Sequence, residues 1–384
     1  MYTFWQKASM TLPAYPCKIS LDSRAALPGK HDSSIAYHFV KEIAGMKKVK
    51  VGIAGLGRLG KEHAKNLAFK IANAELAAAC SIVPAELEFA QKELGVQEVY
   101  SDFDEMLAKA DLDAVAIITT SGLHCEQIAK ALDAGKHVFS EKPLGVNVEE
   151  CKMAEKAVER HPELAFFLGF MRRFDPSYAY AKEKIEAGAI GTPYMVKAAG
   201  IDPEALVQGA IKFAPTSGGI FIDMAIHDID LMRWFLGEDP VEVYAAGATF
   251  KHPEFKAAGD DETGVAMYKC ANGAIGFVHV GRTAAHGYHV ETEVVGTEGT
   301  LRISPVPEKN LCMIYDKNGA VKECVSGFPE RFAEAYRLEM ENFIDCVQQG
   351  KKPEVTVYDG TKSTQIAFAT TQSYKDGKPL KISY

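Results

Sequence analysis

Residues 48–71, KVKVGIAGLGRLGKEHAKNLAFKI, determine how the first half of the chain is expected to fold. The stretch opens as an apolar, β-rich run, which predicts a buried strand, and it closes as a helix. Between them, Gly55, Gly57 and Gly60 form a G-x-G-x-x-G pattern. The first glycine permits a tight turn, the second lets the backbone approach a pyrophosphate, and the third lets helix and strand pack closely. Because the helix N-terminus also offers N–H groups to phosphates, this context favours a dinucleotide site over a plain glycine turn.

The alternation of strands and helices continues along the chain. Apolar runs predict strands over residues 74–80, 112–120 and 136–144, and amphipathic runs predict helices over residues 84–95, 124–135 and 148–160. Such alternation is typical of a doubly wound parallel sheet, whose ligands bind beyond the carboxyl ends of the strands. With the three glycines, the candidate cofactor contacts are therefore Arg58, Leu59, Ser81, Thr119, Thr120, His124, Glu141 and Lys142. For His124, which begins a helix, a capping or packing role is an equal alternative.

The end of the second strand bears on the choice between NAD and NADP. An acid about 20 residues past the glycines binds the ribose hydroxyls of NAD and repels the 2′-phosphate of NADP. Ser81 stands there instead, and it cannot repel a phosphate. Arg58 could add a positive charge nearby or could simply face solvent. We therefore expect NAD as the cofactor, with NADP also used. Failure to use NADP would point to another residue, such as Glu86.

The second half of the chain has a different pattern. Residues 261–282, 288–304 and 312–325 are predicted hairpins, the first turning at Asn272-Gly273. An α+β domain with an open, mainly antiparallel sheet is expected over residues 170–384, after a Rossmann domain over residues 46–169. The last helix that the sequence predicts, over residues 331–350, could pack back on the first domain. Residues 1–45 lack periodicity and are interpreted as a tag, a misassigned start or a disordered extension.

Composition limits the class of protein. A length of 384 residues suggests two domains. The net charge of −8 argues against a nucleic-acid partner, because binding phosphates requires clustered positive charge. No apolar run approaches the ~20 residues of a membrane helix. The eight cysteines form no CxxC pair, which favours a reduced, cytoplasmic chain.

An acid and an imidazole stand four residues apart in GGIFIDMAIHDID, residues 218–230. If the run is helical, Asp223 and His227 share one face. The pair could bind a metal, exchange protons or serve structure alone. A metal is not expected, because a divalent site needs further ligands at matching spacing.

Lys142 is a second candidate functional residue. It follows a strand end, and Pro143 restricts it to an extended conformation, which favours a functional role.

Several motifs together resemble one family. They are SEKPL at 140–144, GFMRRFDPSY at 169–178, SGGIFIDMAIHDIDLMRW at 217–234 and EVVGTEGTLRI at 293–303. From about Lys47 to the C-terminus, the chain resembles the Gfo/Idh/MocA oxidoreductases, and within them the inositol 2-dehydrogenase branch. The resemblance implies a Rossmann domain followed by an open-sheet α/β domain. It also implies a homo-oligomer, either a tetramer or a dimer.

The resemblance also implies roles for individual residues. Lys142, Asp223 and His227 match the catalytic positions, with His227 as the base. Lys142 would stabilise the reacting oxygen, and Asp223 would bind a neighbouring hydroxyl or orient the imidazole. Together with these three, the candidate substrate contacts are Arg172, Asp202 and Tyr288, although Arg172 could equally be a structural ion-pair partner.

The implied reaction is oxidation of a secondary hydroxyl of a cyclic polyol, inositol to 2-keto-inositol, with hydride transfer to a nicotinamide cofactor. One alternative is a sugar or sugar-derivative dehydrogenase of the same family. Another is a non-catalytic NAD(P)-binding regulator, although such a regulator needs no set of catalytic side chains. The sequence does not separate myo-inositol from scyllo-inositol, because that choice depends on pocket geometry.

Overall fold

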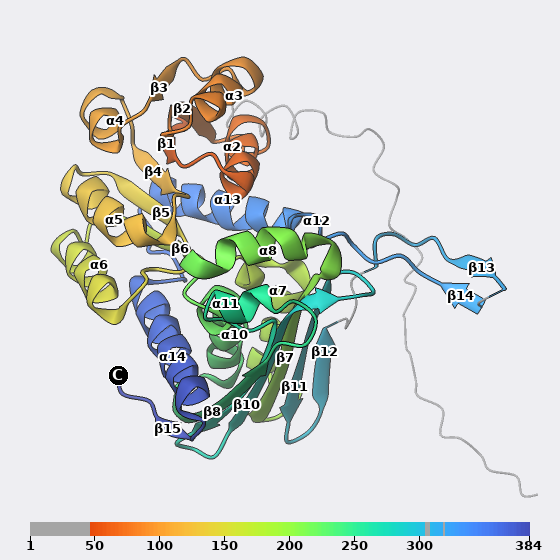
Figure 1. Ribbon diagram of the computed structural model, residues 1–384. Coiled ribbons are helices and arrows are strands. Elements are labelled where there is room, and N and C mark those ends of the chain that lie inside the picture. Colours follow the sequence, from red (N-terminus) through yellow and green to blue (C-terminus); the bar gives the residue numbers. More distant parts are fainter. Residues whose placement is uncertain (1–46, 304–307, 318) are drawn as a thin grey trace, which may run out of the picture. The chain divides into compact units, whose positions relative to one another are not determined.

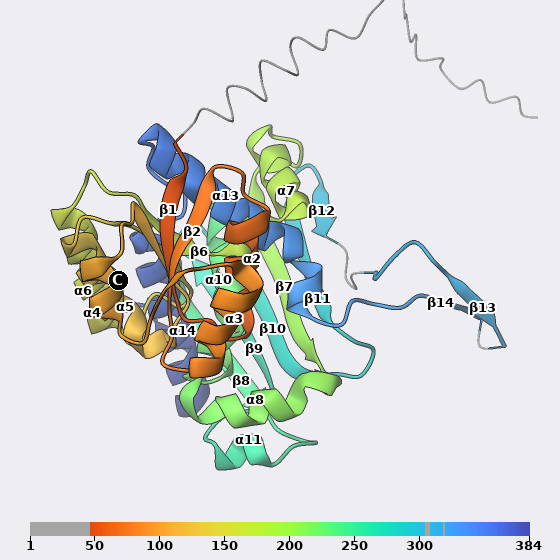
Figure 2. The same cartoon turned by 90° about the horizontal axis from the view of Figure 1, so that it is seen from above.

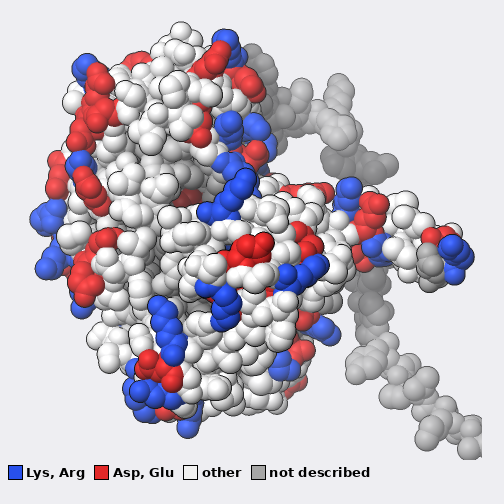
Figure 3. Space-filling model, viewed as in Figure 1, with Lys and Arg blue, Asp and Glu red and all other residues white. Residues whose placement is uncertain are grey.

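The computed structural model describes residues 47–303, 308–317 and 319–384 (Figure 1). The interpretation of residues 1–45 lies outside these ranges. Within them, no helix combines the length and apolar character needed to cross a membrane. On the face shown in Figure 3, Lys and Arg side chains are interspersed with Asp and Glu.

The first sheet has six strands in the order β3-β2-β1-β4-β5-β6, and each neighbouring pair is parallel. This confirms the predicted doubly wound sheet. The strand order reverses between β1 and β4, so a crevice is expected beyond their carboxyl ends. The strands are β1 (Val49–Ala54), β2 (Ala74–Cys80), β3 (Glu98–Tyr100), β4 (Ala114–Ile117), β5 (His137–Glu141) and β6 (Phe166–Gly169).

Helices cover both faces of this sheet, as Figures 1 and 2 show. One face packs against α4 (Phe103–Lys109), α5 (His124–Asp133) and α6 (Val148–Arg160). The other packs against α2 (Arg58–Phe69), α3 (Pro84–Leu94) and α13 (Ala333–Gln349).

Helix α13 comes from near the end of the chain, yet it belongs to the core of the first sheet. Its Met340, Phe343 and Ile344 are fully buried in one cluster with residues of β1 and α2. Asn73 donates a hydrogen bond to Asp345 over 2.8 Å. This helix thus returns the chain to the first sheet before the last helix and the last strand join the second.

The second sheet has seven strands in the order β12-β11-β7-β10-β9-β8-β15. All neighbouring pairs are antiparallel except β7 and β10. This confirms a mainly antiparallel sheet. Gly273, with φ +91°, lies in the predicted turn between β9 and β10. The strands are β7 (Pro193–Pro203), β8 (Pro240–Ala248), β9 (Thr263–Cys270), β10 (Ile275–Ala284), β11 (His289–Gly296), β12 (Thr300–Ile303) and β15 (Leu380–Lys381).

One face of the second sheet packs against α7 (Pro176–Glu186), α9 (Ile220–Asp223), α10 (Ala225–Leu236) and α14 (Val357–Asp376). Side chains on the opposite face remain exposed. The other elements are η1 (Ser121–Leu123), η2 (Met171–Phe174), η3 (Glu204–Leu206), α8 (Val207–Phe213), η4 (Ala214–Thr216), α11 (Glu254–Ala257), β13 (Ile314–Asp316), β14 (Gly319–Val321) and α12 (Phe328–Arg331).

Candidate active site

The glycine turn between β1 and α2 has the geometry that a dinucleotide requires. Gly55 adopts φ +89°, and a Cβ there would lie 2.5 Å from the carbonyl oxygen of Ile118. A Cβ on Gly60 would lie 2.1 Å from the carbonyl oxygen of Gly55, so any larger residue would push α2 away from the turn. A Cβ on Gly57 would meet nothing within 4 Å, so the backbone there faces open space. The three glycines therefore fit a bound pyrophosphate.

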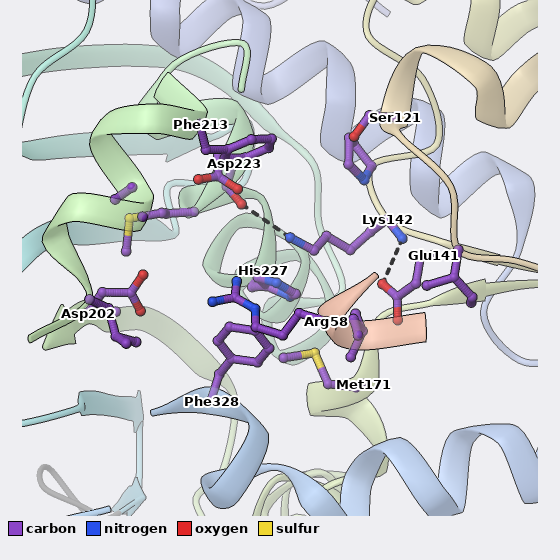
Figure 4. Close-up of a pocket in the computed structure, with 18 of the residues that line it drawn as sticks. Arg58, Ser121, Glu141, Lys142, Met171, Asp202, Phe213, Asp223, His227 and Phe328 are labelled. Atoms are coloured by element: carbon purple, nitrogen blue, oxygen red, sulfur yellow. Dashed lines mark hydrogen bonds between the residues drawn. The ribbon is translucent and has the colours of Figure 1, made fainter. Parts of the chain in front are cut away.

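A cavity of about 490 Å³ lies beyond the carboxyl ends of the first sheet (Figure 4). Its size suits a small ligand or part of a cofactor. All six predicted substrate contacts line it: Lys142, Arg172, Asp202, Asp223, His227 and Tyr288. The predicted cofactor contacts that line it, besides Lys142, are Arg58, Leu59, Thr119, His124 and Glu141. Ser81, Thr120 and the three glycines are not among its lining residues.

Lys142 reaches across the cavity from the end of β5. Its ammonium group donates a hydrogen bond to the backbone oxygen of Asp223 over 3.3 Å. Its backbone N–H donates to the carboxylate of Glu141 over 3.1 Å. The Lys142–Pro143 peptide bond is cis. Figure 4 shows the lysine side chain directed toward Asp223, with His227 close by.

Asp223 and His227 lie on consecutive helices rather than on one. Helix α9 ends at Asp223 and α10 begins at Ala225. The carboxylate of Asp223 accepts a hydrogen bond from Arg282 over 3.1 Å. In the described part of the chain, no hydrogen bond joins Asp223 to His227, so Asp223 does not orient the imidazole directly. Both side chains nevertheless line the same cavity.

His227 is held as a neutral imidazole. Burial lowers its pKa well below the ordinary value, and the positive charges of Lys142 and Arg172 lower it further. Its Nδ1 atom is buried without a hydrogen-bond partner among the described residues. A neutral imidazole can accept a proton, whereas an imidazolium cannot.

Arg172 has a buried partner of its own. Its guanidinium donates to Asp228 over 2.5 Å, and both side chains are buried. It also lies 5.5 Å from the ring centre of Phe332. This geometry favours the structural alternative for Arg172, in which the ion pair fixes the cavity wall. Tyr288 is also buried, which raises the pKa of its hydroxyl.

Asp202 is an acid whose charge is sensitive to its surroundings. Burial and the negative charge of Asp223 raise its pKa to about 6, against the opposing effects of Arg282 and Arg58. It lies near the end of β7, on the cavity side opposite Lys142 in Figure 4. Near neutral pH it is mostly ionised and can accept hydrogen bonds.

The ring of His124 connects two loops. Its Nδ1 lies 2.8 Å from the carbonyl oxygen of Pro143, and its Nε2 lies 3.1 Å from that of Thr119. Because protein atoms occupy both ring nitrogens, the packing alternative is favoured over a cofactor contact. The hydroxyl of Thr119 donates to Gln127 over 2.6 Å, and Thr120 is exposed.

Arg282 was not predicted, yet it connects the elements around the cavity. It lies in β10 and is 2% exposed. Besides Asp223, its guanidinium contacts Asp260 over 3.3 Å. The sequence offered one signal for its role, which is that this charged residue directly follows the apolar strand GFVHVG, residues 276–281. Its two acidic partners are distant in sequence and could not be inferred.

A second unpredicted cluster lies behind Lys142. His63 is 2.9 Å from Glu141 and 4.0 Å from Glu339, and all three side chains are buried. Among the described residues this group is close enough to share a metal ion. Burial and the negative charge of Glu141 raise the pKa of Glu339 well above its ordinary value. The protonated, neutral form of Glu339 is therefore favoured.

Comparison with known proteins places this geometry in a family. Residues 49–170 match the family described as an oxidoreductase family with an NAD-binding Rossmann fold, and residues 178–302 match the GFO/IDH/MocA C-terminal domain. A curated relative, the scyllo-inositol 2-dehydrogenase (NAD(+)) of Bacillus subtilis, is 37% identical over 87% of this chain and 96% of its own length. The chain belongs to the GFO/IDH/MocA oxidoreductase family. The predicted resemblance, the oxidoreductase class and the NAD-binding fold are thereby confirmed.

Other members of the GFO/IDH/MocA family extend the similarity. The myo-inositol 2-dehydrogenase of Thermotoga maritima is 32% identical over 87% of this chain and 98% of its own. The crystal structure of scyllo-inositol dehydrogenase from Lactobacillus casei with NAD(H) and scyllo-inositol matches with a TM-score of 0.85 and 46% identity. That match covers 87% of this chain and 99% of the other.

Proposed function

We propose that this protein is an NAD-dependent inositol 2-dehydrogenase, which oxidises one secondary hydroxyl of a cyclic polyol to a ketone. The observation that carries the proposal is the neutral His227 beside Lys142, in a cavity at the carboxyl edge of a nucleotide-binding sheet. The inositol dehydrogenases among its relatives support the choice of substrate class. When bound, the nicotinamide ring supplies the acceptor for the hydride.

His227 is the general base in this proposal. Oxidation of an alcohol releases a hydride and a proton, and the imidazole takes the hydroxyl proton. Lys142 donates a hydrogen bond to the reacting oxygen and stabilises the negative charge that develops there. Burial, together with this positive charge, keeps His227 neutral before the reaction.

The remaining polar groups position an uncharged substrate. Asp223, fixed by Arg282, and Asp202 present carboxylate oxygens to neighbouring hydroxyls. Tyr288 offers a hydroxyl. Arg172 is occupied by Asp228 and therefore acts by shaping the wall of the cavity.

We propose that residues 46–169 form the dinucleotide-binding domain and residues 170–384 the substrate domain, with α13 returning to the first. The glycine turn would hold the pyrophosphate, with Leu59 and Thr119 at the edge of the cavity. His124 and Glu141 would position the loop of Lys142.

The cysteines of the described ranges are free, which supports a reducing, cytoplasmic location that cell fractionation can test.

We further propose a homo-oligomer, either a dimer or a tetramer, built through the uncovered face of the second sheet. Apolar side chains on this face are between 37% and 54% exposed: Tyr244, Val265, Met267, Ile275 and Phe277. Met267 pairs in register with both Tyr244 and Phe277, so the side chains share one face. An apolar group of this kind is typical of an interface.

Replacing His227 tests the proposed mechanism. With scyllo- or myo-inositol as substrate, His227→Ala should lower kcat by about 10²–10⁴-fold, because the base is lost. NAD binding, measured by calorimetry, should be nearly unchanged. Near-normal turnover in the alanine variant would exclude His227 as the base.

Replacing Lys142 tests its role separately. Lys142→Arg should turn over inositol more slowly than the wild type, because a forked guanidinium cannot replace a point-like ammonium.

A further inference from the structure

The hydroxyl of Ser81 is already engaged within the protein. It donates a hydrogen bond to Oε2 of Glu86 over 2.6 Å and accepts one from the backbone N–H of Val83 over 3.1 Å. Its single proton is therefore committed to a carboxylate. The expectation that both NAD and NADP are used rested on Ser81 alone, which cannot repel a phosphate.

The contact with Ser81 holds Glu86 near the position where a ribose-binding acid usually stands. The backbone N–H of Gly55 donates to the carbonyl oxygen of Cys80 over 2.9 Å, so the end of β2 lies beside the glycine turn. Glu86 lies in the first turn of α3, which follows β2. Its side chain is half-buried, and its Oε1 has no hydrogen-bond partner among the described residues. One carboxylate oxygen thus remains available for a ligand.

The arginine considered as a phosphate partner is directed elsewhere. The guanidinium of Arg58 lies 4.8 Å from the ring centre of Phe328, and its charge acts on Asp202. Figure 4 shows it beside Phe328 and His227. Arg58 therefore contributes to the substrate cavity, on which Ser81 does not border.

We propose that Glu86, held by Ser81, is the residue that selects NAD over NADP. Its carboxylate accepts a ribose hydroxyl and repels a 2′-phosphate, the role usually taken by an acid at the end of the second strand. The acid is supplied five positions later in the sequence and is brought back by the hydrogen bond from Ser81. The inference rests on the proposed function, since it concerns the cofactor of the same site.

Glu86→Gln tests the inference, because glutamine keeps the shape and removes the charge. Glu88→Gln is the matched control: it makes the same charge change on the same helix, at a side chain that pairs with Lys92. Dissociation constants for NAD⁺ and NADP⁺ are measured by calorimetry on each purified full-length protein. Inositol turnover is measured separately on the same samples.

The wild type should bind NAD⁺ at least about tenfold more tightly than NADP⁺, because juxtaposed like charges disfavour the phosphate. Glu86→Gln should reduce that ratio by about tenfold, mainly through tighter NADP⁺ binding, while Glu88→Gln leaves it unchanged. Equal wild-type affinities, or an unchanged ratio in Glu86→Gln, would overturn the inference. If the ratio shifts but inositol is not oxidised, the inference stands and the proposed function fails.

Discussion

Asp202 is an acid in the cavity whose pKa lies close to neutral pH. Its pKa is raised to about 6, so it gains a proton as the pH falls through that value. The protonated group loses its charge and accepts hydrogen bonds less well. Substrate binding through Asp202 should therefore weaken on the acid side of pH 6, whereas His227 stays neutral there because its own pKa is lowered.

This difference predicts a pH profile. For the wild type, kcat/KM with inositol should fall as the pH decreases from 7 to about 5, with an apparent pKa near 6. In Asp202→Asn this decline should disappear, and at pH 7 KM should be raised above that of the wild type. Steady-state kinetics across that range measure both effects, and thermal unfolding controls for loss of structure. A variant that keeps the wild-type decline would assign it to another group.

Single residues were predictable where local sequence fixes their position. Lys142 follows a strand of a parallel sheet, and the ends of such strands meet at one edge, so its place in the cavity could be inferred. The partners of these residues could not be inferred. Arg282 and Asp223 are 59 positions apart, and their contact depends on how β10 packs near α9. The Ser81–Glu86 bond depends on the course of one short loop.

Elements were predictable where their signal is local. The Asn272-Gly273 turn and the alternating strands beside it gave the β9–β10 hairpin directly. Helix α14 gave no comparable signal. Five of its buried residues carry hydroxyl side chains, and two of these donate to the preceding turn: Thr361 to the carbonyl oxygen of Val357 and Thr370 to that of Ile366. Such a helix lacks the apolar stripe by which helices are found in a sequence.

Contacts between elements that are distant in sequence could not be predicted from local sequence patterns. Strands β7 and β10 pair in parallel, although a hairpin-rich segment suggests antiparallel neighbours. A helix was predicted over residues 331–350, but its packing against the first domain was only one alternative. The packing of this helix could not be inferred because its neighbours are distant in sequence: Glu339 lies beside His63 and Glu141, which belong to the first half of the chain.

At the scale of the whole molecule, the apolar face of the second sheet predicts self-association. Met267→Asp should shift the protein toward the monomer, because it places a charge in the proposed interface. Met153→Asp is a matched control on α6, since Met153 is 53% exposed and Met267 is 54% exposed. Light scattering coupled to size-exclusion chromatography measures the mass of each protein. If the wild type is a monomer, or if both variants keep its mass, the face is not an oligomer interface.

The central claim is that this chain oxidises inositol with NAD. The most direct test is the formation of NADH by the purified protein, followed at 340 nm with scyllo-inositol, myo-inositol and a panel of aldoses at equal concentrations. We predict that at least one inositol is oxidised with kcat/KM about tenfold or more above that of any aldose, since a fitted set of hydrogen-bonding groups discriminates strongly. Turnover of aldoses alone, or no turnover of either class by a protein that binds NAD⁺, would contradict the account.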